Sequence, residues 1–459
     1  KTDPNPQLDI FTAPSMQLGS RASKKYSAPN SWHNQFYSLV TTKIDEEIFK
    51  PLFPEGKKSG RPNASIRILV AMSVLKEGFG CSDEDLFEKC EFDLLTRKAL
   101  GMELLTDVTP SIDTYYLFRR RICEYQERTG IDLMQLCFEQ LAGKHVHLLK
   151  ISGKCVRMDS KLIGSNIARQ SRYELIHTTL VKFLKTCTLT HLSPEQEERA
   201  KEYLKEDSSK TVYRSDSDTL QSNLARIGNF IMEMLAVFPA TSPEHDLLQR
   251  LFDEQYVVMD GKAVLRDKKE VKADSLQNPN DPDATYRAKN DQKVQGYVTN
   301  ITETVEEGKP NIITSVQVET AVFADCHFLQ EAVENSERVT DSTIEDLYAD
   351  GAYQSPDNRE FAKNHNAMQL KTGKMQGGCR WELIPHDEDG LTIREIATGN
   401  TYEAVKAVTI QGSRKRWRIP WNNKTGWRYF EDKDIKAYQL RKQIESLPLE
   451  EQHKRNNVE

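Results

Sequence analysis

Cys155-Val-Arg-Met-Asp-Ser-Lys-Leu-Ile-Gly-Ser-Asn166 is an apolar run of strand type that contains an aspartate, Asp159. A carboxylate at such a position is costly unless it is paired or binds a metal. A second stretch, Leu347-Tyr-Ala-Asp-Gly-Ala-Tyr353, ends a short apolar run at Asp350, and the glycine after it allows a sharp turn that exposes the carboxylate. We therefore expect Asp159 and Asp350 to lie on two neighbouring strands.

The segments around these aspartates alternate between strand and helix patterns. We expect strands at 156–166, 294–302, 312–318, 344–349 and 368–370, and helices at 328–339 and 356–364. Three strands, a helix, a strand, a helix and a strand is the order of an RNase H-like core. The sequence therefore predicts an α/β domain over 151–459, interrupted by a helical insertion at about 170–250 and a β-rich insertion at about 375–430, with a polar loop at 265–290.

The first 150 residues have a different character. Residues 1–29 are polar and predict a flexible tail, whereas 30–150 predict an all-helical domain. Ser82-Asp-Glu-Asp85 has the form of a capping box, and Pro110-Ser111 precedes another helical stretch. Two capped helices joined by a short segment predict a helix-turn-helix.

Three consecutive arginines lie on the second of these helical stretches. They are Arg119, Arg120 and Arg121. We expect them to project toward DNA phosphates, and a solvated charged face is the alternative interpretation.

Composition limits the function classes. A formal charge of −6 argues against a uniformly basic nucleic-acid binder, so any DNA contact must come from local basic patches. No apolar run approaches the ~18 residues of a membrane span. The eight cysteines form no Cys-x-x-Cys pair, which argues against structural zinc and indicates reduced thiols in a cytoplasm.

A third acidic residue, Glu459, closes the sequence on a helical stretch. Two strand-end carboxylates facing a third on a helix form an all-oxygen site, which suits Mg²⁺ or Mn²⁺. Two such ions about 4 Å apart clamp the attacking and leaving oxygens of a phosphodiester. We expect Asp159, Asp350 and Glu459 to be the catalytic metal ligands. Because Glu459 is the last residue, we also expect the chain to be truncated at its C-terminus.

Several motifs, taken in order, resemble those of bacterial insertion-sequence transposases of the DDE type. They are Gly60-Arg-Pro62, Gly80–Leu86, Phe118-Arg-Arg-Arg121, Asp281–Lys289 with Gln295-Gly-Tyr297, Ala349–Ser355 and Arg455-Asn-Asn-Val-Glu459. The resemblance covers roughly residues 30–459. Each motif alone is modest, and their order along one chain makes the match specific.

The resemblance implies an enzyme that cuts the 3′ ends of a mobile element and joins them to target DNA. Its implied partners are double-stranded DNA with terminal inverted repeats, target DNA and a second copy of the chain. Its implied location is the bacterial cytoplasm, in association with the nucleoid. A stand-alone metal-dependent nuclease and a catalytically inactive DNA-binding remnant are the alternatives.

The third acid has a competitor. Tyr438-Gln-Leu-Arg-Lys-Gln-Ile-Glu445 matches the Tyr-x2-Arg-x3-Glu signature of some related transposases, but Gln452 stands where that signature continues with lysine. Arg455–Glu459 keeps the spacing of arginine and glutamate and resembles the third-acid motif of the subgroup that shares this N-terminal domain. We prefer Glu459, and Glu445 stays open.

Other basic residues predict further DNA contacts. Arg414, Lys415, Arg416, Trp417 and Arg418 combine cations with aromatic rings, which suits backbone phosphates and unpaired bases. Lys371 and Lys374 follow the expected fifth strand and would reach phosphate near the metals. Asp325 follows a strand, and we expect it to cap a helix.

Overall fold

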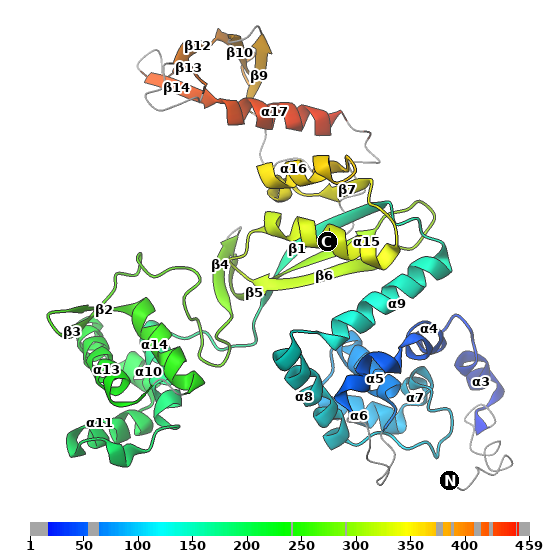
Figure 1. Ribbon diagram of the computed structural model, residues 1–459, viewed down its shortest axis with the longest axis horizontal. Coiled ribbons are helices and arrows are strands. Elements are labelled where there is room, and N and C mark those ends of the chain that lie inside the picture. Colours follow the sequence, from blue (N-terminus) through cyan, green and yellow to red (C-terminus); the bar gives the residue numbers. More distant parts are fainter. Residues whose placement is uncertain are drawn as a thin grey trace. The chain divides into compact units, whose positions relative to one another are not determined.

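The chain divides into two compact units. The computed structural model describes residues 17–53, 64–239, 242–289, 292–372, 380–386, 390–407, 415–421, 426–446 and 448 (Figure 1). The first unit comprises Lys1–Val156, Glu303–Ser315 and Glu334–Ile344, and the second comprises Arg157–Thr302, Val316–Val333 and Glu345–Glu459. The expected α/β class with a helical N-terminal region is confirmed.

A six-stranded sheet forms from the apolar runs that predict strands. In spatial order it contains β4 (Thr285–Lys289), β5 (Gln292–Thr304), β1 (Cys155–Gly164), β7 (Asp346–Ala349) and β8 (Gln369–Thr372), and β6 (Ile313–Thr320) also pairs with β5. Strands β7 and β8 are parallel, whereas β4 and β5 are antiparallel. The five expected strands are confirmed. The sixth, β4, lies in the segment that we expected to be a loop, because its polar residues pair with the edge of β5.

Two expected helices accompany the sheet (Figure 1). They are α15 (Leu329–Thr340) and α16 (Pro356–Asn364). The bounds of α16 agree with the sequence prediction because the start signal is local. Pro356 occupies the first turn, and the Ser355 side chain accepts a hydrogen bond from the Asn358 backbone N–H at 3.0 Å.

The helical part of the first unit is built from α3 (Ser20–Tyr26), α4 (Trp32–Leu39), the 3-10 turns Thr41–Lys43 and Glu46–Leu52, α5 (Ile66–Phe79), α6 (Asp83–Phe92), α7 (Leu94–Leu100), α8 (Ile112–Thr129) and α9 (Leu133–Leu149). Its core includes Met72, Leu86, Tyr115 and Phe118. The capping box at Ser82 is confirmed.

Two expectations about this part need correction. Residues 20–26 form a helix rather than a flexible tail, because Tyr26 is buried to 6% exposure and anchors it. The expected pair of consecutive helices is also interrupted. Helix α7 lies between α6 and α8, started by Asp93, whose side chain accepts from the backbone N–H groups of Leu95 and Thr96.

The helical insertion of the second unit has its own core. It contains α10 (Arg172–Leu184), α11 (Pro194–Lys205), α12 (Ser208–Arg214), α13 (Ser217–Val237), α14 (Pro243–Gln255) and a hairpin of β2 (Tyr256–Met259) and β3 (Lys262–Leu265). The apolar stripe of α13 packs in this core through Leu224, Ile227 and Ile231. The sequence patterns predicted no strands at 256–265, where this hairpin forms.

Two small sheets form in the segment where we expected a β-rich insertion. One three-stranded sheet contains β9 (Trp381–His386), β10 (Gly390–Glu395) and β11 (Thr401–Glu403), and another contains β12 (Val405–Ala407), β13 (Arg416–Trp421) and β14 (Gly426–Glu431). Helix α17 (Asp432–Glu445) follows, and Ile435 joins the same core. No helix in the described ranges has the length and apolar character needed to cross a membrane.

Gly228 provides a test of packing in the helical insertion. A Cβ atom at Gly228 would lie 2.3 Å from Tyr256 Cε1, and that ring is held by its buried hydroxyl, which donates to the Leu224 carbonyl at 2.8 Å. We predict that Gly228→Ala lowers the free energy of unfolding by about 1–3 kcal/mol, because overpacking outweighs the better helix propensity of alanine.

The matched control is Gly78→Ala in α5, where the added Cβ meets no atom within 4 Å. It should stabilise by up to about 1 kcal/mol. The measurement is chemical denaturation of both variants, and a shift of the same sign in the two would contradict the packing argument.

Candidate active site and nucleic-acid surfaces

Asp159 and Asp350 come from neighbouring strands. Asp159 follows the fully buried Val156 and Met158 on β1, and its own side chain is partly exposed. Asp350 directly follows β7 and is also partly exposed. Its carboxylate accepts a hydrogen bond of 2.5 Å from the Ala352 backbone N–H, which starts the 3-10 turn Gly351–Tyr353. Local turn chemistry therefore orients this carboxylate.

Tyr353 ends the 3-10 turn that follows Asp350. It is fully buried. Burial raises the pKa of its hydroxyl most, and the charges of Asp159, Asp325 and Asp350 raise this pKa further, whereas a hydrogen bond with the Ser160 side chain lowers it. Asp159 and Asp350, at the neighbouring strands β1 and β7, and Asp325 are thus close enough for their charges to act on the Tyr353 hydroxyl.

A chain of hydrogen bonds holds Tyr353 in place. Its hydroxyl donates to Asn300 Oδ1 at 2.7 Å, and Asn300 Nδ2 donates to Gln317 Oε1 at 2.9 Å. Gln317 Nε2 donates in turn to Glu331 at 3.1 Å. On the other side, Asn358 Nδ2 donates to the Tyr353 carbonyl at 2.8 Å. The turn after Asp350 is thus tied to β5, β6, α15 and α16.

The expectation that Asp325 caps a helix is wrong. Asp325 is 4% exposed and does not cap the 3-10 turn Asp325–Phe328, which has no side-chain cap. Instead, Arg287 on β4 donates to Asp325 Oδ1 at 3.1 Å and to the carbonyls of Ala321 and Phe323. A buried carboxylate needs a cation beside it. Arg287 in the motif Asp281–Lys289 is that cation, and it is the sequence feature that could have indicated the ion pair with Asp325.

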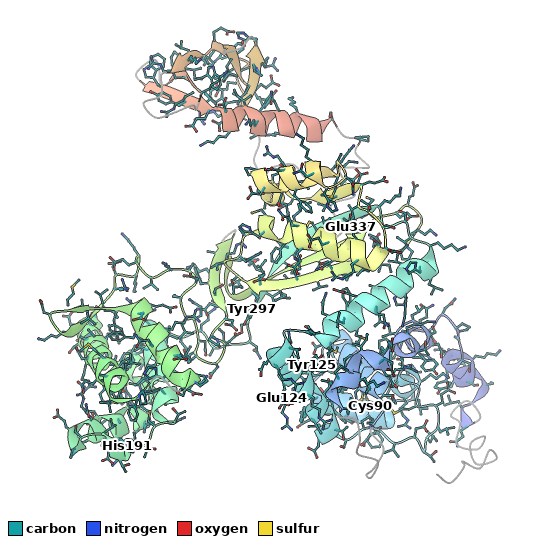
Figure 2. The ribbon with its side chains drawn as sticks, in the orientation of Figure 1. Cys90, Glu124, Tyr125, His191, Tyr297 and Glu337 are labelled. Carbon is teal, nitrogen blue, oxygen red and sulfur yellow. The ribbon has the colours of Figure 1, made fainter. Side chains whose placement is uncertain are left out.

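Hydrogen bonds also hold Asp281, the first residue of the motif Asp281–Lys289. Asp281 accepts hydrogen bonds from the hydroxyls of Tyr297 and Ser165 (Tyr297 is labelled in Figure 2). Burial and the hydrogen bond to Asp281 both raise the pKa of Tyr297. Ser165 follows β1 and Tyr297 lies on β5, so the motif serves here to join the strands of the sheet.

The third acid is not located. Glu459 lies outside the described residues, and Glu445 is the last residue of α17. Within the described ranges, no group of three histidine, cysteine or acidic side chains is arranged to hold a metal ion. Asp159 and Asp350 therefore supply at most a partial ligand set among these residues.

Lys371 lies on β8, next to the strand that precedes Asp350. Its ammonium group is 3.1 Å from Asp346 and 3.2 Å from the Tyr348 hydroxyl. Burial alone would lower the pKa of Lys371, but these hydrogen bonds outweigh it and raise the pKa. Lys371 is thus already paired inside its sheet. The companion prediction, Lys374, lies outside the described residues.

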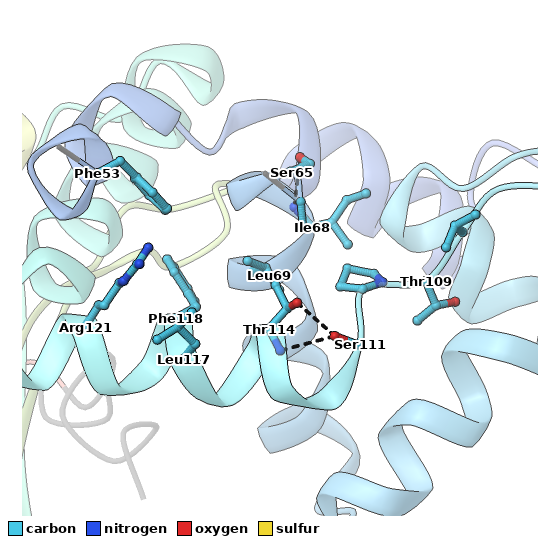
Figure 3. Close-up of a pocket in the computed structure, with 13 residues that line it drawn as sticks. Phe53, Ser65, Ile68, Leu69, Thr109, Ser111, Thr114, Leu117, Phe118 and Arg121 are labelled. Carbon is cyan, nitrogen blue, oxygen red and sulfur yellow. Dashed lines mark hydrogen bonds between the residues drawn. The ribbon is translucent and has the colours of Figure 1, made fainter. Parts of the chain in front are cut away.

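The three arginines of α8 have partners on the protein. Arg119 lies 3.6 Å from Asp83, and Arg120 lies 3.5 Å from Glu124. Arg121 stacks on Phe53, 5.4 Å from the ring centroid, at one side of an open pocket of about 480 Å³ (Figure 3). Arg119 and Arg120 keep exposed side chains, and exposed ion pairs contribute little to stability, so phosphates can compete for them.

The hairpin of β13 and β14 carries cations and rings on its outer face. Arg416 stacks on Tyr429 at 4.0 Å and Arg418 on Trp427 at 4.3 Å, and Trp427 is 48% exposed. Trp417 corrects the prediction for this segment. It is 3% exposed and packs in the core of the β-rich insertion, so its ring is unavailable for stacking on bases. Lys415 is exposed, whereas Arg414 lies outside the described residues.

Comparison with known proteins finds a family match for one part of the chain. Residues 25–121 match a family model described as a transposase domain (DUF772). Comparisons with curated proteins and with solved structures give no match. The matched segment includes Arg119, Arg120 and Arg121 but neither Asp159 nor Asp350. The finding supports a transposase and leaves the catalytic residues as predictions.

The Tyr353 hydroxyl is open to a direct test. We predict that Tyr353→Phe lowers the free energy of unfolding by about 1–3 kcal/mol, because it leaves the buried Asn300 Oδ1 without its donor. Tyr213→Phe is the matched control, because Tyr213 is 90% exposed. Chemical denaturation in which both variants resemble the parent chain would show that the hydrogen bond does not hold the site.

Proposed function

We propose that the chain is a DNA transposase of the DDE type with an RNase H-like catalytic domain. The observation that carries the proposal is the strand order β6-β5-β1-β7-β8, with an aspartate on β1 and another directly after β7. This order, with α15 before β7 and α16 after it, is the one expected of an RNase H-like core. The transposase-domain match over residues 25–121 supports the same conclusion from the other end of the chain.

The chemistry of the donor groups fits Mg²⁺ or Mn²⁺. Asp159 and Asp350 offer carboxylate oxygens, and hard divalent ions prefer oxygen ligands to nitrogen and sulfur. We expect two ions, held by Asp159, Asp350 and a third acid that is Glu459 or Glu445. When bound, such ions lower the pKa of the attacking water or 3′-hydroxyl and stabilise charge on the phosphorane.

The surrounding residues would prepare the carboxylates for this role. The Ala352 backbone N–H orients Asp350, and the Tyr353 hydroxyl, bound to Asn300, fixes the turn that follows. Arg287 neutralises Asp325, which limits the negative charge that accumulates beside Asp159 and Asp350. These residues are positioning residues, and preorganisation of this kind lets an ion bind without reordering the site.

The DNA partners follow from the reaction. Element ends with terminal inverted repeats would contact α8 through Arg119 and Arg120 and the β13–β14 hairpin through Arg416 and Arg418, and target DNA would enter afterwards. Because an element has two ends, we propose that two copies of the chain act together on DNA.

Metal-dependent cleavage tests the proposal. Asp159→Asn and Asp350→Asn should each reduce Mg²⁺-dependent cleavage of a plasmid carrying the element's own flanking sequences by more than about 100-fold, because even outer partners of metal ligands contribute about 10- to 100-fold. Each variant should also lose the rise in unfolding temperature that Mn²⁺ gives the parent chain. Asp357→Asn, an exposed acid on α16, is the control and should retain both properties.

The same assay separates the alternatives. Strand-transfer products identify a transposase, and cleavage without them identifies a stand-alone nuclease. DNA binding without cleavage in either metal identifies an inactive remnant and refutes the proposal. Loss of cleavage in Glu445→Gln but not in Glu459→Gln would assign the third acid to α17, and the reverse would assign it to the end of the chain.

A further inference from the structure

An open pocket of about 490 Å³ lies between α16 and α17 in the second unit. Arg359 and Lys363 of α16 and Lys436 of α17 line it, and all three side chains are exposed. Part of its floor is apolar, because Ala362 and Met368 line it and are each 4% exposed. The pocket thus combines three exposed cationic side chains with a small buried apolar surface.

The three cations line one pocket. Arg359 and Lys363 lie four residues apart on one helix, a spacing at which like charges destabilise a helix by roughly 0.2–0.5 kcal/mol. Within the described part of the chain, none of the three forms an ion pair with an acid. The pocket therefore gathers three cations without an ion pair among the described residues, in a protein whose formal net charge is −6.

Arg359 is oriented for a ligand. Its Nε donates to Gln354 Oε1 at 2.8 Å, which fixes the plane of the guanidinium and leaves the terminal nitrogens to other acceptors. A planar guanidinium recognises phosphate through two parallel hydrogen bonds. Gln354 also lines the pocket and directly follows Tyr353, so the pocket begins four residues after Asp350.

We propose that this pocket binds the sugar-phosphate backbone of duplex DNA that passes the aspartates. The phosphates would bind Arg359, Lys363 and Lys436, and the deoxyribose carbons would contact the floor of Ala362 and Met368. An open pocket with exposed cations suits a polymer, whereas a small ligand is normally enclosed over most of its surface. The inference rests on the proposed function, because it takes the substrate to be DNA.

The salt dependence of DNA binding tests the inference. The triple variant Arg359→Gln, Lys363→Gln and Lys436→Gln is compared with the parent chain by fluorescence anisotropy on a short labelled duplex of arbitrary sequence, with EDTA present so that no cleavage occurs. Each lost phosphate contact lowers the slope of log K against log salt by about 0.9, so the slope should fall by roughly 2–3.

A second triple variant controls for charge alone. Lys201→Gln, Lys205→Gln and Lys210→Gln remove the same charge from exposed positions of α11 and α12 and should leave the slope nearly unchanged. Replacing Arg359→Gln by Arg359→Lys in the triple variant returns one of the three charges and should restore about 0.9 of the lost slope. Thermal unfolding checks that all variants fold.

The possible results distinguish DNA binding by the pocket from the transposase proposal. Equal slopes for the two triple variants, or no binding of DNA by the parent chain, would overturn the inference. If the parent chain cleaves DNA with metal while the first triple variant keeps its slope, DNA binding by the pocket is refuted and the transposase proposal is left standing. If the first triple variant has a lowered slope but the parent chain never cleaves DNA, the transposase proposal is refuted and DNA binding by the pocket is supported.

Discussion

The hydrogen bond from the Tyr353 hydroxyl to Asn300 is the interaction on which the acidic end of the sheet depends. Both residues are fully buried, so neither polar group has water as an alternative partner, and the bond must form in the folded state. It joins the turn after β7 to β5, and the chain of hydrogen bonds continues through Gln317 to α15. The carboxylate of Asp350 is therefore carried on a turn that buried hydrogen bonds hold in place, as the proposed metal site would require.

The distribution of cations in the chain is compatible with the proposed DNA binding despite a net charge of −6. Cations gather in small sets: Arg119 and Arg120 on α8, Arg416 and Arg418 on β13, and the pocket between α16 and α17. In the first two sets an aromatic ring or an acid lies beside each arginine. The pocket set differs because a glutamine alone orients Arg359. We infer that affinity comes from a few ordered contacts rather than from a general positive field.

Local signals in the sequence predicted much of the fold. The capping serine and proline at Ser355 and Pro356 set the start of α16, and the apolar runs at β1 and β7 set the strands that carry the aspartates. The failures came from tertiary contacts that local patterns do not contain. Strand β4 is polar and exists because β5 offers it an edge, and the role of Asp325 depends on Arg287, which lies 38 residues away in sequence. Trp417 resembled a stacking surface because its neighbours are cationic, but strand alternation turns it into the core.

Joint binding of a divalent metal by Asp159 and Asp350 can be measured in a crystal of the chain soaked in Mn²⁺, with anomalous scattering collected at the manganese edge. We expect an anomalous peak within coordination distance of both carboxylates, at about 2.0–2.6 Å from their oxygens. Manganese bound elsewhere, or carboxylates of Asp159 and Asp350 too far apart to share an ion, would contradict it.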